Sequence, residues 1–221
     1  MEESEGPRGG VEAVIFDMDG VILDTETLSN RVWIQAAEEL GLSDIRPAMF
    51  ACIGMNKADT VLLLRRFYGD SFDAPGFLER TSELFREAAA RDGIPLMPHA
   101  LEAVRYVRGR HRLALASSTR EAVVRRQLSA AGLLDCFETL TCGDMVEHSK
   151  PDPEIYLRAC ASLGVEPARC AAIEDSPNGV RSAAAAGLKV VMVPDKIQAE
   201  PEIKALLWHL CPSLDGIKSF L

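Results

Sequence analysis

Two aspartates, Asp17 and Asp19, stand directly after a short apolar run at residues 11–16. Side chains two positions apart on an extended strand point the same way, and the glycine that follows lets the chain turn at once. Two carboxylates held together repel each other, and a divalent cation offsets that repulsion. Oxygen ligands suit Mg²⁺, and Glu174 and Asp175 offer a second acidic pair for the same ion. The alternative is that Asp17 and Asp19 merely end a strand or cap a helix.

Three hydroxyl residues, Ser117, Ser118 and Thr119, follow a second apolar run at residues 113–116. Hydroxyls, and the free N–H groups at the start of a following helix, are donors suited to a bound phosphate. Serine and threonine are also ordinary helix caps. We expect Ser117 to contact a phosphate and Thr119 to cap the helix.

Lys150 lies just before the first of two prolines, at positions 151 and 153. Proline fixes its own backbone angle and keeps the residue before it extended, so the lysine can be aimed. It would supply the local positive charge that an anionic ligand needs in a chain of net charge −9. A solvated loop lysine is the alternative.

Short apolar runs that predict buried strands alternate with segments of helical periodicity. This order favours right-handed crossovers and a doubly wound, Rossmann-like α/β core, with helices on both faces of a parallel sheet. In such a sheet ligands bind at the carboxyl ends of the strands, where the acidic and hydroxyl residues above would meet. The expected strands are residues 11–16, 113–116, 139–142, 170–173 and 189–193, and the expected helices are 100–107, 120–131, 153–163 and 178–186.

Residues 25–95 break this alternation, because they contain helical segments and no strand signal. We therefore predict a small all-helical cap domain inserted after the first strand. Residues 11–24 and 96–221 would form the catalytic core, and residues 1–10 a disordered tail. The expected cap helices are 27–40, 57–68 and 75–90, and one more helix is expected at 200–210.

The composition indicates a globular protein, since 48% hydrophobic residues are enough to build a core. A net charge of −9 disfavours nucleic acid and anionic membrane surfaces, which attract basic proteins, and so favours a small-molecule partner. The six cysteines form no CxxC pair, which indicates buried free thiols in a reducing compartment. No apolar segment approaches the roughly 20 residues that span a bilayer, and residues 1–10 lack the apolar stretch of a signal peptide. We expect a cytoplasmic protein.

Four motifs, taken together and in order, resemble the haloacid dehalogenase superfamily. They are Asp17-Met18-Asp19-Gly20-Val21-Ile22-Leu23-Asp24-Thr25, then Ser117, then Lys150-Pro151-Asp152-Pro153, and finally Glu174-Asp175. The likeness covers residues 11–193. It is closest to members with a helical cap, the sugar-phosphate phosphatase and β-phosphoglucomutase-like branch.

The resemblance implies a role for each acidic position. Asp17 would attack phosphorus, become an aspartyl-phosphate and bind Mg²⁺. Asp19 would protonate the leaving alcohol and then activate water, and its main-chain carbonyl would also bind the metal. Asp175 would be a metal ligand, with Glu174 either a further ligand or a partner that positions one.

The remaining implied sites surround the phosphate ester. Ser117 and Lys150 would hold the transferring phosphoryl oxygens, and the peptide bond after the lysine is cis in some relatives. Met18, Ser118 and Thr25 are further candidates for substrate contacts. Lys57 falls where mutase-like relatives have a phosphate-contacting arginine in the cap, although it could equally begin a solvated helix.

The resemblance implies a Mg²⁺-dependent phosphomonoesterase acting on a small phosphorylated metabolite, in particular a sugar phosphate. The related mutases carry a histidine where this chain has Ser29, and Lys57 replaces their arginine. The run Asp24-Thr25-Glu26 looks like the phosphatase members. β-Phosphoglucomutase-type phosphoryl transfer is the alternative, and a non-catalytic phosphorylation switch is the second alternative. Asp19 disfavours dehalogenation, because the dehalogenases of the superfamily lack this aspartate.

Overall fold

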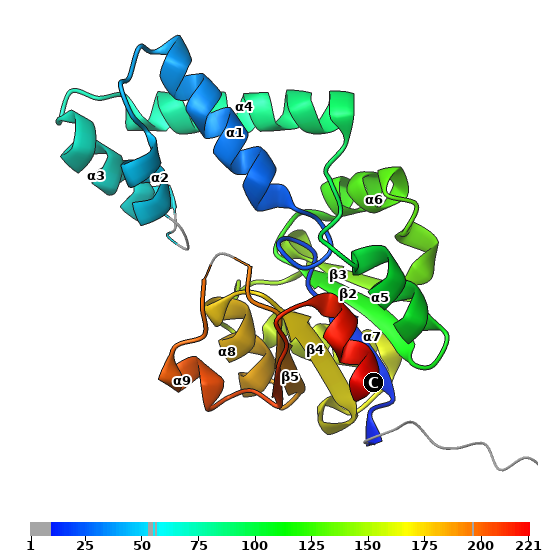
Figure 1. The fold of residues 1–221 in the computed structure, drawn as a ribbon. Helices are drawn as coiled ribbons and strands as arrows, with labels where there is room; N and C mark the ends of the chain where they lie inside the picture. Colours follow the sequence, from blue (N-terminus) through cyan, green and yellow to red (C-terminus); the bar gives the residue numbers. More distant parts are fainter. Residues whose placement is uncertain (1–9, 53–54, 56, 196) are drawn as a thin grey trace, which may run out of the picture. The chain divides into compact units, whose positions relative to one another are not determined.

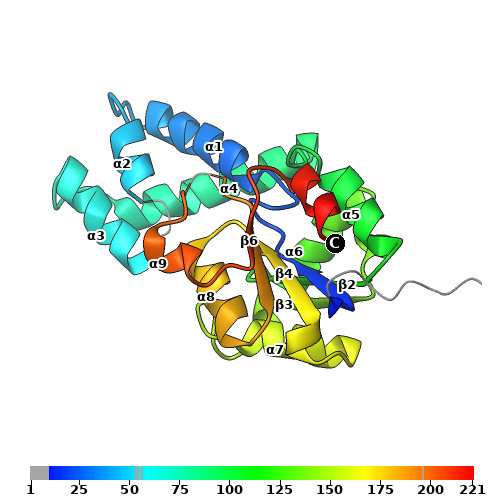
Figure 2. The same ribbon diagram turned by 60° about the horizontal axis from the view of Figure 1, so that its bottom comes forward.

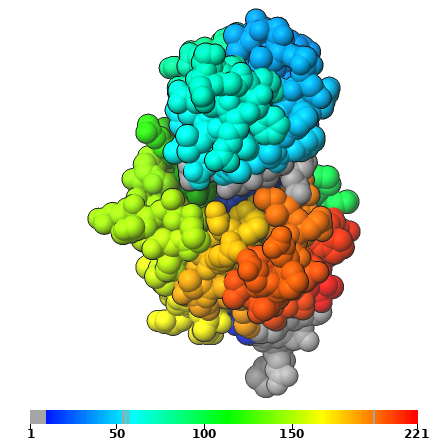
Figure 3. Space-filling model, turned by 90° about the vertical axis from the view of Figure 1, so that its left-hand side faces the viewer, coloured from blue at the N-terminus to red at the C-terminus, as the bar shows by residue number. Residues whose placement is uncertain are grey.

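The computed structural model describes residues 10–52, 55, 57–195 and 197–221. Except for Gly10, the expected tail at residues 1–10 lies outside the described residues. The chain divides into two compact units: Met1–Asp24 with Pro95–Leu221, called the core unit, and Thr25–Ile94, called the helical unit. Each gathers into a body of its own in the space-filling view (Figure 3). Among the described helices, none combines the length and apolar composition that a bilayer crossing requires.

The core unit is built on a six-stranded parallel sheet with the order β3-β2-β1-β4-β5-β6 (Figure 1). From the first strand, the chain moves outward on one side and then returns to build the other side. Parallel neighbours need crossover connections, and helices supply them. This arrangement confirms the predicted fold class. The strands are β1 (Ala13–Phe16), β2 (Arg112–Ser117), β3 (Thr139–Cys142), β4 (Cys170–Glu174), β5 (Lys189–Met192) and β6 (His209–Leu210).

Helices cover both faces of this sheet, and they are α5 (Ala100–Arg108), α6 (Glu121–Ala130), α7 (Glu154–Leu163), α8 (Pro177–Ala185) and α9 (Pro201–Lys204), with short 3-10 helices η2 (Leu134–Cys136), η3 (Gly143–Met145), η4 (Pro167–Arg169) and η5 (Leu214–Ser219). Side chains alternate along a strand. Ile15 and Ala114 therefore join a buried cluster with α7, α8 and α9 on one face. Val14 and Leu113, on the other face, are also buried. Helices α5 and α6 cover that face (Figure 2).

The switch in strand order falls at β1, which pairs with β2 on one side and β4 on the other. Its last residue, Phe16, is in register with Leu115 of β2 and Ile173 of β4. The three strands therefore end at nearly the same level. Residues at or just beyond their carboxyl ends share one edge of the sheet, where ligands bind in folds of this class.

The helical unit has its own apolar core, in which Leu28, Leu64, Phe77 and Leu84 are buried. Trp33 packs edge-on against Phe77, with ring centroids 5.3 Å apart. The second helix of this unit was not predicted, because six residues are too few to show a helical period. The helices are α1 (Thr25–Glu39), α2 (Arg46–Ala51), α3 (Lys57–Tyr68) and α4 (Ala74–Asp92).

The helix expected at residues 200–210 is wrong in its second half. Helix α9 ends at Lys204, and the chain then extends along β5. The N–H of Trp208 donates to the carbonyl of Val190 at 2.7 Å, and the N–H of Cys211 donates to the carbonyl of Met192 at 2.9 Å. The open edge of β5 thus recruits this segment as β6. The six cysteines are buried free thiols, as predicted.

Candidate active site

Asp17 is the first residue after β1, at the carboxyl edge of the sheet. Its backbone N–H donates to the carbonyl of Ile173 in β4 over 2.9 Å, which fixes where the side chain begins. Only 7% of the residue is exposed. A carboxylate this buried needs a charged or hydrogen-bonding partner, and Lys150 supplies one.

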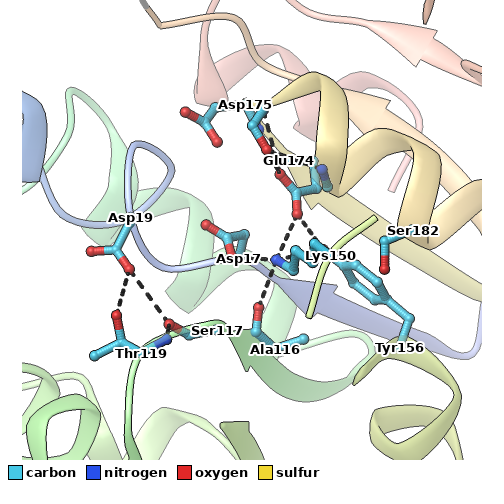
Figure 4. Close-up of polar contacts among 12 residues, drawn as sticks. Asp17, Asp19, Ala116, Ser117, Thr119, Lys150, Tyr156, Glu174, Asp175 and Ser182 are labelled. Atoms are coloured by element: carbon cyan, nitrogen blue, oxygen red, sulfur yellow. Dashed lines mark hydrogen bonds and ion pairs between the residues drawn. The ribbon is translucent and has the colours of Figure 1, made fainter. Parts of the chain in front are cut away.

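Lys150 joins three elements at this edge (Figure 4). Its Nζ donates to Oδ1 of Asp17 at 2.6 Å, to Oε1 of Glu174 at 2.7 Å and to the carbonyl of Ala116 at 3.1 Å. Burial would lower the pKa of this ammonium, but the negative charges of Asp17 and Glu174 raise the pKa well above its ordinary value. Lys150 therefore stays charged. The Lys150–Pro151 peptide bond is cis.

Glu174 ends β4 and is completely buried. Its Oε1 accepts hydrogen bonds from Lys150 and from the hydroxyl of Tyr156, each at 2.7 Å, and its Oε2 accepts the N–H of Asp175 at 3.2 Å. A Cβ at Gly179 would overlap this carboxylate, so glycine is required where α8 begins. Donors on both oxygens satisfy a carboxylate that would otherwise be costly to bury.

The turn after Asp17 depends on Gly20. Its φ of 76° lies in the left-handed region that residues with a side chain rarely adopt. A Cβ on Gly20 would also overlap the carboxylate of Asp175. Glycine therefore lets the loop after β1 approach the loop after β4.

Asp17, Glu174 and Asp175 each present a carboxylate oxygen, and these oxygens lie within 4.8 Å of one another. Burial, with repulsion from the other two groups, raises the pKa of Asp175 to about 9. Burial also raises the pKa of Asp17, against the opposing effect of Lys150. Lys150 is ion-paired with Asp17 and Glu174, so a divalent cation beside the three carboxylates would balance the remaining negative charge. An all-oxygen donor set fits the Mg²⁺ that the sequence analysis expected.

The carboxylate of Asp19 is not part of this group. Its Oδ2 accepts a hydrogen bond from the Thr119 hydroxyl at 3.1 Å and lies 3.5 Å from Oγ of Ser117 (Figure 4). The two aspartates therefore have different hydrogen-bonding partners, Lys150 for Asp17 and Thr119 for Asp19. Strand alternation stops at Phe16, and the chain is already turning when it reaches Asp19.

The three hydroxyl residues after the apolar part of β2 differ in position. Ser117 is completely buried, and its Oγ accepts the N–H of Thr119 at 3.1 Å. Ser118 is exposed. The prediction that Thr119 caps the next helix is wrong, because α6 begins one residue later than expected and Arg120 holds the cap position.

The start of α6 does not offer all of its N–H groups to a ligand. The N–H of Glu121, the first residue of the helix, donates to Oδ1 of Asp144 at 2.9 Å. The sequence predicts free donors at this position. The donor is used instead by a carboxylate from the 3-10 helix after β3, which lies next to β2 in the sheet.

Met18 is buried, and its carbonyl accepts the N–H groups of Ile22 and Leu23 at 2.9 and 3.0 Å. These bonds close the loop that carries the two aspartates. The substrate contact expected at Met18 stays a prediction, as do those at Ser117, Ser118 and Lys150.

Two further candidates belong to the helical unit. Thr25 is the first residue of α1, and Lys57 is the exposed first residue of α3. Lys57 also lines a cavity of about 570 Å³ within this unit, together with Ser29. The two positions at which the sequence is expected to differ from the related mutases therefore share one pocket. Its other polar and aromatic walls include Glu26, Trp33, Phe85 and Arg86.

Tyr156 is a further residue of the site, and the sequence did not predict it. Its hydroxyl lies 2.7 Å from Oε1 of Glu174 and 3.4 Å from Nζ of Lys150, and the residue is completely buried. A tyrosine on the apolar face of α7 gives the same sequence signal as a packing residue. The only available indication was that it follows Lys150 by six positions, just past the proline-rich turn.

The chain matches the family described as haloacid dehalogenase-like hydrolase over residues 11–187. It is 32% identical to the phosphorylated carbohydrates phosphatase of Thermotoga maritima, over 81% of this chain and 83% of that protein. It is also 32% identical to hexitol phosphatase B of Escherichia coli K12, over 82% of this chain and 83% of that protein. Its structure resembles a Thermotoga maritima crystal structure provisionally described as a β-phosphoglucomutase, with a TM-score of 0.78 and 30% identity, over 96% of this chain and all of that one.

The family match spans every motif from Asp17 to Asp175 and covers most of the chain. It confirms the predicted superfamily, and the relatives named as phosphatases confirm the predicted type of enzyme. The chain belongs to the haloacid dehalogenase-like hydrolase family, as an enzyme of its phosphatase type.

Proposed function

We propose that the chain is a Mg²⁺-dependent phosphomonoesterase that hydrolyses a phosphorylated sugar or polyol through an aspartyl-phosphate on Asp17. One observation carries this proposal: Lys150 links Asp17 to Glu174, with Asp175 beside them, at the carboxyl edge of the sheet. Such a group suits a phosphate and a divalent ion together. Similarity to two phosphatases named for phosphorylated carbohydrates and hexitols supports the substrate class.

Asp17 is the proposed nucleophile of the first step. One of its carboxylate oxygens bonds to phosphorus while the bond between phosphorus and the ester oxygen breaks. Asp19 gives its proton to that ester oxygen, and the alcohol leaves. The products of this step are the free alcohol, the aspartyl-phosphate and an ionised Asp19.

Water completes the cycle in the second step. Its oxygen bonds to phosphorus as Asp19 takes one of its protons, and the bond between phosphorus and the Asp17 oxygen breaks. Inorganic phosphate leaves, and both aspartates return to their starting states. The same carboxyl group thus serves first as acid and then as base.

The other residues hold the phosphoryl group and the metal. Lys150 and Ser117 would bind phosphoryl oxygens where negative charge concentrates during transfer. Asp17, Asp175 and the main-chain carbonyl of Asp19 would hold Mg²⁺, with Glu174 as a further ligand or as the group that positions them. The ion would neutralise charge on the carboxylates and the phosphoryl oxygens.

A phosphate-release screen over sugar, polyol and nucleotide phosphates, with Mg²⁺ present, tests the proposal. We expect release from at least one sugar or polyol phosphate by the native chain. Asp17→Asn should abolish it, whereas Asp135→Asn, which makes the same change at an exposed carboxyl of the core unit, should not. Undiminished release by Asp17→Asn would overturn the mechanism.

β-Phosphoglucomutase-type transfer is the second candidate, and the likeness to the provisionally described mutase structure favours it. Ser29 and Lys57 favour hydrolysis instead, because these positions carry histidine and arginine in the mutases discussed above. Incubation with β-glucose 1-phosphate separates the two: a mutase forms glucose 6-phosphate, and a phosphatase forms glucose and phosphate. A phosphorylation switch would instead retain its acyl-phosphate without turnover.

A further inference from the structure

The hydroxyl of Thr119 donates a hydrogen bond to a carboxylate of the proposed site, and Thr119 does not cap the helix that follows it. Its Oγ1 donates to Oδ2 of Asp19 at 3.1 Å, whereas Oγ of Ser117 lies at a longer 3.5 Å from the same oxygen (Figure 4). Good hydrogen bonds between hydroxyl and carboxylate oxygens are close to 3 Å or shorter. Thr119 is therefore the stronger of these two donors to Asp19.

Hydrogen bonds to both the N–H and the carbonyl of Thr119 hold its backbone, so the position of its side chain is defined. Its N–H donates to Oγ of Ser117 at 3.1 Å, and its carbonyl accepts the N–H of Gly143 at 3.0 Å. A Cβ on Gly143 would overlap the carbonyl oxygen of Ser118, so the loop after β3 packs tightly against the loop after β2. These contacts hold Thr119 independently of Asp19.

From this geometry we propose that Thr119 is a positioning residue, which sets the orientation in which Asp19 exchanges its proton. The inference rests on the proposed function, in which Asp19 acts as acid and then as base. A carboxyl group held in one orientation delivers its proton along a reproducible path, and small displacements of a catalytic group reduce rate strongly. Thr119 itself exchanges no proton with the substrate.

The leaving group gives a readout that a purely structural role would not move. An alkyl phosphate releases an alkoxide, which must be protonated as it leaves. The nitrophenolate of p-nitrophenyl phosphate is a stable anion and leaves without that help. Misplacing Asp19 should therefore slow release of the alkyl leaving group far more than release of the aryl one, whereas the later attack of water on the aspartyl-phosphate is common to both substrates.

The experiment compares kcat/KM, which covers only the steps up to release of the leaving group, for fructose 1-phosphate and p-nitrophenyl phosphate. It uses the native chain, Thr119→Val and Thr119→Ser, with sorbitol 6-phosphate as the alkyl substrate if fructose 1-phosphate is not hydrolysed. We expect Thr119→Val to lower kcat/KM for the alkyl phosphate by about 10- to 100-fold and for the aryl phosphate by less than about threefold. Serine keeps the hydroxyl, so Thr119→Ser should restore both rates. Thr139→Val is the matched control, because it removes a hydroxyl that bonds Ser162 at the other end of β3.

Equal losses on both substrates, no loss on either, or no rescue by serine would overturn the role of Thr119 and leave the proposed function standing. Failure of the proposed function gives a different result, since Asp17→Asn would then retain phosphate release. Thermal unfolding of each variant checks that the fold is kept.

Discussion

Tyr156 donates its phenolic hydroxyl to Oε1 of Glu174 over 2.7 Å, and neither side chain reaches solvent. Burial, with the negative charge of Glu174 next in effect, raises the pKa of Tyr156 well above its ordinary value, so the phenol remains a donor. The bond comes from α7, and it holds the carboxylate that also accepts Lys150. A residue of a helix that packs on the sheet thus holds a charged group of the site in place.

Removing this hydroxyl should destabilise the fold. Tyr156→Phe keeps the ring but leaves a buried carboxylate without one of its donors, and we expect a loss of about 1–3 kcal/mol in the free energy of unfolding. Tyr106→Phe is the control, because its hydroxyl reaches a partly exposed carbonyl of Lys218 at 3.2 Å and should matter by less than about 0.5 kcal/mol. Urea denaturation measures both. Equal losses in the two variants would contradict the role of Tyr156.

Lys150→Met should affect both stability and turnover. The variant leaves Asp17 and Glu174 buried without their ammonium partner, and breaking a buried pair in this way costs about 3–5 kcal/mol. Turnover should fall by at least about 100-fold, since the charge that faces the transferring phosphoryl group is lost. Denaturation at neutral pH and phosphate release are the measurements. Lys218→Met, at an exposed lysine, should change neither, and native-like turnover by Lys150→Met would contradict the proposed role.

The sequence predicts those residues of the site that lie at the ends of strands. Asp17, Ser117 and Glu174 lie where the apolar runs of β1, β2 and β4 stop, and parallel strands in register bring those ends together. Helical periodicity without a strand signal also predicted the helical insertion. For these residues, position in the chain nearly determines position in space.

The rest depends on tertiary contacts that have no local signal. Tyr156 reaches Glu174 because α7 packs on the sheet, and Thr119 reaches Asp19 because two loops meet. Residues 205–210 carry an apolar pattern that suits a helix or a strand equally, and the free edge of β5 decided between them.

Mg²⁺ should stabilise the native chain, because it would reduce the repulsion among three carboxylates. We expect a rise in Tm with added MgCl₂, equivalent to about 2.7 kcal/mol at a hundredfold excess over Kd, and loss of turnover after chelation. Asp175→Asn should remove the shift. Without Mg²⁺ this variant should be at least as stable as the native chain, since burial and like charges raise the pKa of Asp175 to about 9. Thermal unfolding with and without the ion tests both statements, and an undiminished shift in Asp175→Asn would contradict the proposed ligand.

Lys57→Ala should weaken substrate binding more than catalysis. The lysine lines the cavity of the helical unit, so we expect KM for the best sugar or polyol phosphate to rise about tenfold while kcat changes little. KM for p-nitrophenyl phosphate should stay nearly constant, because that substrate lacks sugar hydroxyls. Arg66→Ala removes an exposed cation from the same helix and should leave both KM values unchanged. A KM for the sugar or polyol phosphate that stays native in Lys57→Ala would support the alternative that Lys57 only begins a solvated helix.

His111 should make the stability of the fold depend on pH. It is buried at the start of β2, its Nδ1–H donates to the carbonyl of Val11 at 3.1 Å, and burial lowers its pKa below the ordinary 6.5. As pH falls below 6.5, the unfolded chain binds a proton at His111 before the folded chain does, so the stabilising effect is complete above that value and is lost toward the lower folded pKa. His111→Asn keeps a donor without this titration. Its stability should fall less than that of the native chain between pH 8 and pH 5, and the two falls should differ by up to about 1 kcal/mol.

His99→Asn, at an exposed position with a positive φ that asparagine tolerates, should follow the native chain. Urea denaturation at the two pH values decides the matter, and parallel losses in the native chain and His111→Asn would show that another group carries the dependence.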